Sequence, residues 1–235
     1  MLRADVGLIG GTGVGPRLAA LGGVRFGMPT PFGLMRGRLV EHKGLLLAVV
    51  ARHAAGHRLP PHAVNYRAMA WGLGRMGVKG VLATAAVGSL APEVGVGSMV
   101  ACTDLVDLSG RNLTLFEHEV RHVDMGACFP LASVLAASDV RSGGTYVNVN
   151  GPRYETPAEI LGMARLGDVV GMTAGTEAVA FREAGVTYGC LAVVSNLAAG
   201  LGGETLEHGH VTDALESCGP RVVEILLSAA ERVGA

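Results

Sequence analysis

A dense group of basic side chains directly follows an apolar run near residue 50. Three histidines and two arginines come within eleven residues after residues 45–51. They are Arg52, His53, His57, Arg58 and His62. Guanidinium and imidazole groups bind oxyanions such as phosphate. A zinc site is the alternative, but no Cys or acidic residue lies close by in the sequence, and two arginines would repel a cation. The group therefore predicts recognition of an oxyanion.

A glycine-rich segment near the N-terminus offers a second contact for an anion. The apolar strand candidate Val6–Ile9 runs into Gly10–Gly15, which contains Thr12. Glycines let backbone N–H groups approach an anion closely, and Thr12 adds a hydroxyl. The Gly-x-Gly-x-x-Gly spacing of dinucleotide sites is absent, and no acidic residue ends a second strand about 20 positions on. A nicotinamide cofactor is therefore not expected, and a plain tight turn is the alternative interpretation.

An aromatic side chain and a carboxylate stand together on a later loop. Tyr154 and Glu155 follow a Gly-Pro break, and Thr156 is placed to cap a helix that Pro157 opens. An aromatic face can stack on a flat heterocycle while a carboxylate accepts hydrogen bonds from its N–H edge. Asn196, after another apolar run, can both donate and accept. The alternatives are an ordinary surface Glu beside a packing Tyr, and an Asn that satisfies a turn.

Apolar runs alternate with helical patterns along the chain and supply the elements that must position these groups. Strands are predicted at 6–9, 45–51, 80–84, 100–108, 145–149 and 188–195, an antiparallel pair at 26–39, and helices at 65–76, 131–137, 157–166, 178–184 and 211–233. A break in the last helix is allowed at Gly219-Pro220. This order predicts a three-layer α/β/α fold with a mostly parallel, mixed central sheet, in a single domain over residues 1–235.

The strand ends gather the candidate chemistry at one edge of the predicted sheet. Ligands of such sheets lie outside the carboxyl ends of the strands. Four segments are predicted to be loops there. They are Gly10–Gly13, Arg52–His53, Ala85–Ser89 and Met172–Thr173. Three of them could bind an oxyanion, and the fourth pairs a thioether with a hydroxyl. Residues 112–129 lack a clear period and are predicted to form a long functional or interface loop.

Composition narrows the function classes further. Apolar residues make up 49% of the 235, yet no run reaches the roughly 20 apolar residues of a membrane span. The formal charge is −1 without a basic stripe, which argues against nucleic acid or a membrane surface as partner. The four cysteines are scattered and form no Cys-x-x-Cys pair, and the first residues show no signal-peptide pattern. We expect a cytoplasmic protein without a metal site.

Together these motifs resemble the trimeric purine nucleoside phosphorylases, a group that includes methylthioadenosine and methylthioinosine phosphorylases. The similarity covers nearly the whole chain. The segments that carry it are Ile9–Gly13, Thr30–Gly33, Arg52–His57, Pro60–His62, Asn65–Arg67, Ala86–Leu90, Gly151–Glu159 and Gly171–Thr173. Each segment alone is a weak signal, but their shared order makes the resemblance specific.

The resemblance implies phosphorolysis, in which inorganic phosphate attacks C1′ of a purine nucleoside and releases the base and ribose 1-phosphate. No cofactor is implied, because phosphate is a co-substrate. The implied phosphate contacts are Thr12, Arg52, His53, the backbone at Ala86, and Thr173. The implied base contacts are Tyr154, Glu155, Asn196 and Val87, and the implied ribose contacts are Met172 and His208. Asn196, His53 and Glu155 are the implied catalytic residues.

Two residues narrow the implied substrate. Family members for 6-oxopurines resemble this chain in having Glu at position 155 and Asn at position 196. Glu155 can accept from N1–H of hypoxanthine or guanine, which adenine lacks, and Asn196 can donate to O6 and accept from protonated N7. His208, or His210 in its place, would suit a 5′-hydroxyl. The first expectation is therefore a phosphorylase for inosine or guanosine. The alternatives are a 5′-methylthioinosine or 5′-methylthioadenosine phosphorylase and, in another class, a non-catalytic protein that binds purine nucleosides.

The chain departs from the family pattern at two positions in its motifs, and it is also shorter than most relatives, particularly in the loop 118–124 and at the C-terminus. Ala85 stands where relatives commonly have Ser, Thr or Asn, which would remove a polar contact near phosphate. Gly175-Thr176 replaces a Val-Pro pair that commonly precedes the Glu matching Glu177. These departures could alter substrate choice or weaken phosphate binding. The resemblance also implies a homotrimer, with residues 116–122 of one subunit completing the 5′ pocket of another.

Overall fold

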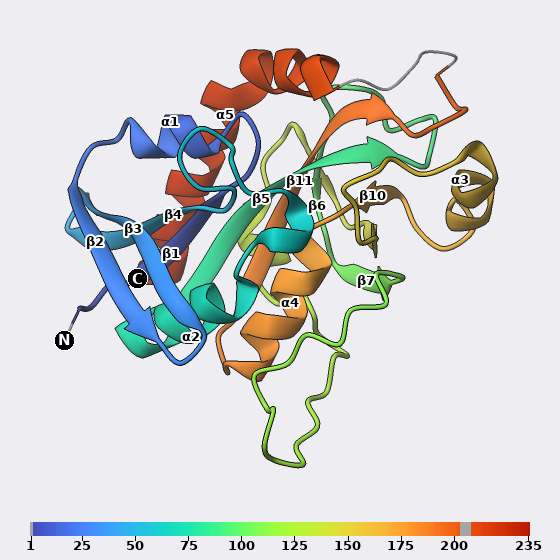
Figure 1. The fold of residues 1–235 in the computed structure, drawn as a ribbon. Coiled ribbons are helices and arrows are strands. Elements are labelled where there is room, and N and C mark those ends of the chain that lie inside the picture. Colours follow the sequence, from blue (N-terminus) through green and yellow to red (C-terminus); the bar gives the residue numbers. More distant parts are fainter. Residues whose placement is uncertain (1, 203–207) are drawn as a thin grey trace.

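Eleven strands and seven helical segments form the chain in the computed structural model, which describes the backbone of residues 2–202 and 208–235 and the side chains of residues 2–202 and 215–235 (Figure 1). The strands are β1 Val6–Gly10, β2 Val24–Thr30, β3 Gly33–His42, β4 Leu45–Ala51, β5 Gly80–Ser89, β6 Met99–Ala101, β7 Asp104–Asp107, β8 Val140–Ser142, β9 Thr145–Asn148, β10 Val169–Gly171 and β11 Tyr188–Leu197. The α-helices are α1 Gly15–Ala19, α2 Tyr66–Met76, α3 Pro157–Met163, α4 Ala174–Glu183 and α5 His208–Gly234, and two 3-10 turns span Pro61–Ala63 and Ala132–Leu135.

All the described strands join one mixed sheet that branches at β5. The main path runs β2-β3-β4-β1-β5-β10-β9-β7, and β11, β6 and β8 leave it from β5. Strands β4, β1, β5 and β11 are mutually parallel, so their carboxyl ends share one edge. Where β1 ends, the last two residues of β5 pair with β10 in the antiparallel sense. The fork therefore lies at the edge where the candidate chemistry was predicted.

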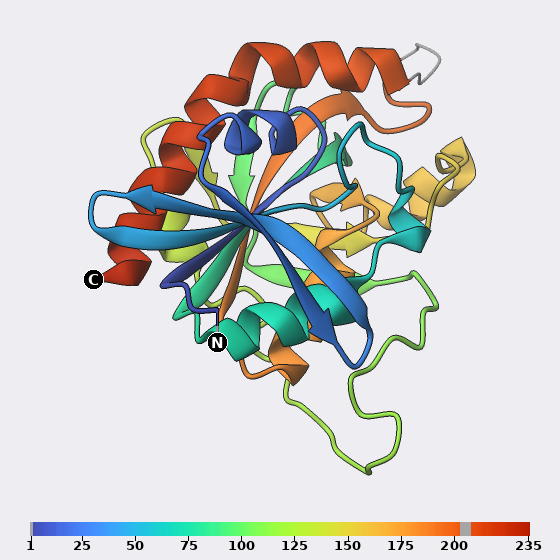
Figure 2. The same ribbon diagram turned by 60° about the vertical axis from the view of Figure 1, so that its left-hand side comes forward.

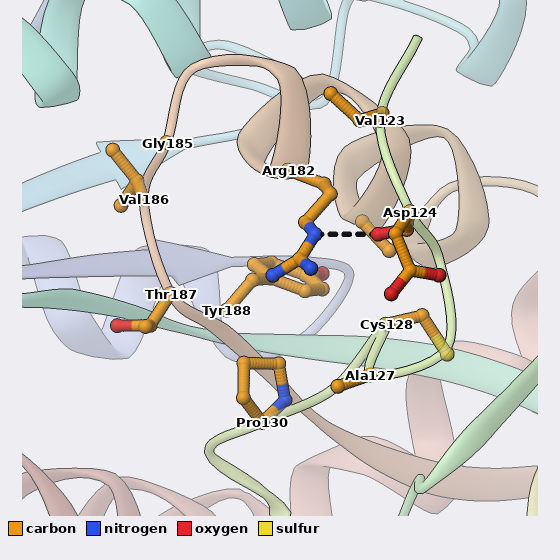
Figure 3. A pocket seen from close by; sticks show the side chains of 11 residues that line it. Val123, Asp124, Ala127, Cys128, Pro130, Arg182, Gly185, Val186, Thr187 and Tyr188 are labelled. Carbon is orange, nitrogen blue, oxygen red and sulfur yellow. Dashed lines mark hydrogen bonds between the residues drawn. The ribbon is translucent and has the colours of Figure 1, made fainter.

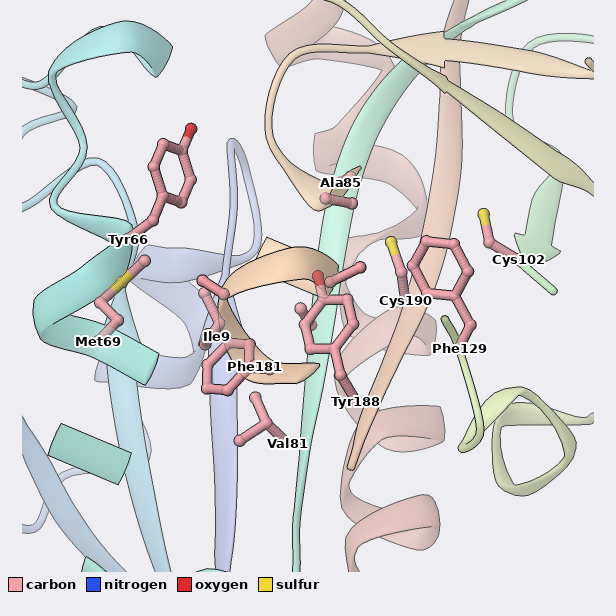
Figure 4. Packing of buried hydrophobic residues seen from close by; sticks show 14 of the residues in the cluster. Ile9, Tyr66, Met69, Val81, Ala85, Cys102, Phe129, Phe181, Tyr188 and Cys190 are labelled. Atoms are coloured by element: carbon pink, nitrogen blue, oxygen red, sulfur yellow. The ribbon is translucent and has the colours of Figure 1, made fainter. Parts of the chain in front are cut away.

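Helices cover both faces of the sheet, as the alternation of side chains along the strands requires. In β5, Val81 and Ala83 belong to the apolar cluster that packs on α2 and α4, whereas Leu82 between them belongs to the cluster that packs on α1 and α5. Figures 1 and 2 show these helix pairs on opposite sides of the sheet. Tyr188 and Phe181 stack in the first cluster with ring centroids 5.2 Å apart (Figure 4). The predicted three-layer fold with a mostly parallel, mixed sheet is confirmed.

Two predicted strand ends need correction. Strand β5 continues through Ser89, so residues 85–89 form the end of a strand and not a loop. Strand β11 continues through Leu197, so Asn196 lies inside it. The reason in both cases is backbone pairing, because β5 and β11 bond each other along this stretch and β10 adds to the end of β5. Small residues therefore line the edge from a paired strand, which holds them more firmly than a loop would.

Several boundaries also differ from the sequence-based expectation. The predicted strand 100–108 divides into β6 and β7 with a break at Cys102-Thr103, and the predicted helix 131–137 is only a short 3-10 turn. Helix α4 begins at Ala174, ahead of the predicted start at residue 178. Helix α5 passes through Pro220 without ending there. None of the described helices is long and apolar enough to cross a membrane.

Candidate active site

A cavity of about 410 Å³ opens at the edge where the parallel strands end. Ten residues predicted from the sequence line it. They are Thr12, Arg52, His53, Ala86, Val87, Tyr154, Glu155, Met172, Thr173 and Asn196. The side chains of His208 and its alternative His210 lie outside the described residues. The fold thus brings the predicted anion contacts and the predicted heterocycle contacts, which are far apart in sequence, into one cavity.

Arg52 is held by a buried network at the deep end of this cavity. Its Nε and Nη2 donate to the two carboxylate oxygens of Glu177, at 2.5 and 2.7 Å, and its Nη1 donates to the Thr84 carbonyl at 2.7 Å. The Tyr188 hydroxyl donates to Glu177 at 2.6 Å. Arg52 is 2% exposed and Glu177 is fully buried. Burial alone would lower the pKa of Arg52, but the Glu177 carboxylate outweighs it and raises that pKa, so the guanidinium stays charged.

The network leaves Arg52 with donors to spare. A guanidinium has five N–H groups, and the three bonds named above use one each. The glycine loop lies close to Arg52 and Thr84 because residue 11 has no side chain. A Cβ at Gly11 would lie 2.6 Å from Arg52 Nη1 and 2.9 Å from the Thr84 carbonyl oxygen. The Gly11 N–H donates to the Thr84 hydroxyl at 3.1 Å. Thr84 therefore fixes both the loop that carries Thr12 and the side chain of Arg52.

His53 is oriented by the loop that follows β4. Its Nδ1 lies 2.8 Å from the Leu59 carbonyl oxygen, which can only accept, so Nδ1 is the protonated nitrogen in this contact. The Leu59 N–H donates in turn to the His53 carbonyl at 3.1 Å. The rings of His53 and His57 stack with centroids 4.3 Å apart. This reciprocal pair of bonds closes the loop and holds the imidazole in the wall of the cavity.

Thr173 and Met172 form the wall beside α4. Thr173 stands at the N-cap of α4 without a capping bond from its hydroxyl. The buried Tyr146 hydroxyl takes that place, at 3.4 Å from the N–H groups of Thr173 and Ala174. The Met172 sulfur lies against Gly151, where a Cβ would come within 2.4 Å of it. Glycine at residue 151, with a φ of +65°, therefore lets the Gly-Pro loop pack closely on Met172.

Glu155 belongs to the more open part of the cavity lining, since its side chain is half-buried whereas Arg52 is buried. The loop that carries it is fixed by a capping box, in which Thr156 Oγ1 accepts from the Glu159 N–H and the Glu159 carboxylate accepts from the Thr156 N–H. Arg153 pairs with Glu159 through two hydrogen bonds, of 2.7 and 2.9 Å, and leaves Glu155 beside it. Burial, together with the nearby Glu159 charge, raises the pKa of Glu155. A half-buried carboxylate of this kind favours a ligand that donates a proton.

Asn196 faces the cavity at an irregular point of β11. The register of β11 with β5 shifts between Val194 and Asn196, which is the effect of a β-bulge. The Asn196 amide nitrogen donates to the Leu197 carbonyl at 2.9 Å, and its oxygen lies 2.9 Å from the Ser195 hydroxyl. Each amide group keeps one further hydrogen-bonding position, a second N–H and a second lone pair. Asn196 can therefore donate and accept at once toward a ligand.

The phosphorylase superfamily model matches residues 5–231 of the chain. The chain belongs to this superfamily. A probable S-methyl-5′-thioinosine phosphorylase of Methanopyrus kandleri is 37% identical over 233 residues, which cover 94% of this chain and 90% of the relative. The 6-oxopurine nucleoside phosphorylase of Pyrococcus furiosus is 38% identical over 201 residues, which cover 78% and 76%. The methylthioadenosine phosphorylase of Schistosoma mansoni in complex with adenine superposes with a TM-score of 0.91 at 28% identity, covering 99% of this chain and 92% of that structure.

The resemblance drawn from the sequence motifs is thereby confirmed, and the structure explains both departures from the phosphorylase pattern. Ala85 lies in the apolar core with 1% exposure, so the cavity is lined by the residues after it (Figure 4). The expected loss of a polar contact at Ala85 is therefore not a loss from the cavity wall. Gly175 packs on Asn148, where a Cβ would lie 2.5 Å from the Asn148 Cβ, and Asn148 Nδ2 donates to the Thr176 hydroxyl at 3.3 Å. The pair Gly175-Thr176 thus accommodates a buried Asn on β9.

Several residues that line this cavity were not predicted from the sequence. Ser195 and Pro152 line it, together with the already noted His57 and Arg58. Ser195 was not predicted because it stands at the end of an apolar run, and the register shift that leaves it unpaired between Val194 and Asn196 has no mark in the sequence. Among the described residues, no cluster of three or more His, Cys, Asp or Glu side chains could hold a metal ion.

A second cavity, of about 290 Å³, lies at the opposite end of β11 (Figure 3). Residues from the end of α4 and from the long loop after β7 line it, and Arg182 Nε donates there to the Asp124 carbonyl at 2.6 Å. It contains none of the predicted site residues. The Tyr188 side chain lines this second cavity, and its hydroxyl donates to Glu177. Tyr188 therefore links the second cavity to the hydrogen-bond network that holds Arg52.

Proposed function

We propose that the protein is a purine nucleoside phosphorylase for 6-oxopurine nucleosides, inosine and guanosine. Inorganic phosphate attacks C1′, the C1′–N9 bond breaks with its electron pair going to the base, and the products are the free base and ribose 1-phosphate. The enzyme needs no cofactor for this exchange. Support comes from the superfamily match, the names of the relatives and the donors and acceptors gathered in the large cavity.

At the deep end, we assign phosphate to Arg52, His53, Thr12, Thr173 and the backbone of Ala86. The charged guanidinium has two unused N–H groups, and the Thr173 hydroxyl is not spent on capping α4. Phosphate held below C1′ acts as the nucleophile, and its negative charge stabilises the oxocarbenium character of the transition state. The fixed Glu177 partner keeps the guanidinium in place throughout, so no reorganisation is needed when charge develops.

At the open end, we assign the base to Glu155 and Asn196, with Tyr154 and Val87 lining its faces and Met172 beside the ribose. Glu155 accepts from N1–H, and Asn196 donates to O6 while it accepts from protonated N7. These bonds strengthen as the leaving base gains electron density, so they favour bond breaking. His208 is assigned to the 5′ side from the family resemblance alone.

The single observation that carries the choice of a 6-oxopurine is the half-buried Glu155 carboxylate, which lines the same cavity as Asn196. Adenine has no proton on N1, so it would leave this carboxylate facing a lone pair. Two hydrogen-bond acceptors that face each other in a half-buried site cost binding energy, whereas hypoxanthine and guanine offer an N1–H donor to the carboxylate.

A second candidate is phosphorolysis of 5′-methylthioinosine, because relatives of that name are 37 to 39% identical to the chain. It shares the 6-oxopurine base and therefore the roles of Glu155 and Asn196. The two candidates differ only at the 5′ end, where His208 or His210 would favour a hydroxyl over a methylthio group.

One assay separates these functions. The protein is incubated with inosine, guanosine, adenosine, 5′-methylthioinosine and 5′-methylthioadenosine, each with and without phosphate, and base release is followed by chromatography. Phosphate-dependent release from inosine or guanosine is expected, with adenosine the poorer substrate. Release without phosphate would overturn phosphorolysis, preference for 5′-methylthioinosine would select the second candidate, and binding without turnover would indicate a non-catalytic protein.

We also propose a cytoplasmic homotrimer in which residues 116–122 of one subunit reach the 5′ end of another subunit's cavity. The proposal rests on the family resemblance and on the length of the loop after β7, which projects from the body of the protein (Figure 1). Light scattering of the purified protein is expected to give three times the chain mass, and a stable, active monomer would contradict it.

A further inference from the structure

Arg111, which does not line the cavity itself, bonds two loops that do. Its Nε and Nη2 donate to the side-chain and main-chain oxygens of Asn150, the latter at 2.8 Å. Its Nη1 donates to the Pro61 carbonyl at 3.4 Å. Asn150 begins the loop that carries Tyr154 and Glu155, and Pro61 belongs to the segment that follows His53. One guanidinium thus bonds both loops that the proposed function uses.

The Arg111 guanidinium packs on the ring of Tyr66, a buried residue. Its guanidinium carbon lies 5.6 Å from the centre of the Tyr66 ring, and Tyr66 is 1% exposed at the first turn of α2. The Tyr66 hydroxyl donates to the same Pro61 carbonyl at 2.7 Å. A planar guanidinium can stack on the ring and fork to two oxygens at the same time, which a lysine ammonium cannot. The contact set therefore depends on arginine and not merely on positive charge.

Neither Arg111 nor Asn150 lines the cavity, so neither is assigned to contact substrate. We propose that Arg111 is a positioning residue that sets the separation between two loops. One is the phosphate loop, residues 52–61, and the other is the base loop, residues 150–155. This inference rests on the proposed function, because it concerns the two substrates of that reaction. Loss of the fork releases the loop at Asn150 and leaves the Pro61 carbonyl with the Tyr66 hydroxyl as its one remaining donor of the two, so both nucleoside and phosphate bind less well. Loss of the Asn150 side chain removes one of the two bonds from Arg111 to the base loop and none of those to Pro61.

The test is steady-state kinetics on the full-length enzyme with inosine and phosphate varied in turn. Arg111→Ala is expected to raise KM roughly tenfold for each substrate, as expected for charge-assisted hydrogen bonds. Arg111→Lys is expected to restore only part of this loss. Asn150→Ala is expected to raise KM for inosine but not for phosphate. In the double variant, the inosine KM is expected to match that of Arg111→Ala alone, because the two residues act through one contact.

Glu183→Ala is the matched control. Glu183 anchors the same loop just beyond Arg111, where its carboxylate accepts from the Thr114 hydroxyl and from the Leu115 N–H. Its bonds reach neither Asn150 nor Pro61. The control is expected to loosen the loop and to leave KM for phosphate unchanged, while any effect on inosine is limited to the proposed 5′ contact of residues 116–122. Thermal unfolding of every variant shows how much of any loss of turnover reflects a smaller folded fraction, which changes kcat and leaves KM unaltered.

The outcomes distinguish a failure of this inference from a failure of the proposed function. An inactive wild-type enzyme would overturn the proposed function and this inference together. An active wild type whose Arg111→Ala variant keeps both KM values within twofold would overturn the inference alone. A rise in both KM values for Glu183→Ala equal to that for Arg111→Ala would also overturn it, since general loosening of the loop would then explain the effect.

Discussion

Two charged residues of the cavity lining, Arg52 and Glu155, differ in how they interact with the rest of the protein. Arg52 is buried and bonded to Glu177 and Thr84, in a network that reaches into the core through Tyr188. Glu155 sits on a loop whose arginine neighbour pairs with Glu159 instead. One charge is neutralised by the fold, and the other is left for a ligand to satisfy. We infer that Arg52 provides the same anion contact whichever nucleoside binds, whereas Glu155 discriminates between bases.

The largest effect is expected where the fold neutralises the charge. Arg52→Met leaves the Glu177 carboxylate buried without its partner and should cost about 3 to 5 kcal/mol of unfolding free energy, with loss of activity. Chemical denaturation measures the stability. Adding Glu177→Met to this variant should recover much of the stability but none of the activity. An equally unstable double variant would show that the two residues do not act as a pair.

The opposite pattern is expected at the open end. Glu155→Ala should lower kcat/KM for inosine about tenfold to a hundredfold, because one charge-assisted hydrogen bond to N1–H is lost. Its denaturation midpoint should not fall, since burial disfavours the charged carboxylate in the folded state. Arg153→Ala, on the same loop but paired with Glu159, serves as the control and should retain wild-type kinetics. A marked loss of stability in Glu155→Ala would remove the contrast between the two ends.

A smaller change is expected from the isosteric replacement Asn196→Asp. The aspartate can accept from the amino group of adenine but cannot donate to O6, so the ratio of kcat/KM for inosine over adenosine should fall roughly tenfold. Competition assays with both nucleosides measure this ratio directly. An unchanged ratio would show that Asn196 does not read the six position.

The smallest expected effect is a displacement of the pH profile. Because burial raises the pKa of Glu155, the carboxylate becomes protonated on acidification at a higher pH than an ordinary Glu. Protonation removes the acceptor for N1–H, so log kcat/KM for inosine should decline as the pH falls through that raised value. In Glu155→Gln this acid limb should disappear. The sign for stability is opposite, since folding should weaken slightly as the pH rises from the ordinary Glu pKa to the raised one.

Sequence patterns predicted whatever depends on neighbours along the chain. The Thr156-Pro157-Ala158-Glu159 run predicted a helix start, and the structure shows the full capping box there. The run at 45–51 predicted β4 residue for residue. These features depend on local propensity and on apolar periodicity, which a single sequence contains.

What the sequence did not predict depends on pairing between distant segments. Arg52 and Glu177 are 125 residues apart, so nothing in the chain near Arg52 indicates that its charge is already balanced. The bulge that turns Asn196 into the cavity arises from the register with β5. The same register sends Ala85 into the core and Ala86 to the cavity wall. A one-residue change of register would exchange their places, and the sequence alone does not contain that choice.

The branching of the sheet at β5 bears on how such an enzyme can change its substrate over evolutionary time. Residues 86–88 line the cavity from a strand that has β11 on one side and gains β10 on the other. A substitution there must satisfy the packing of three strands before it can serve a new ligand. Glu155, on a loop fixed by its own capping box, can be exchanged without that demand. Substitutions that change the preferred base are therefore tolerated more easily at Glu155 in the loop than at residues 86–88 of β5.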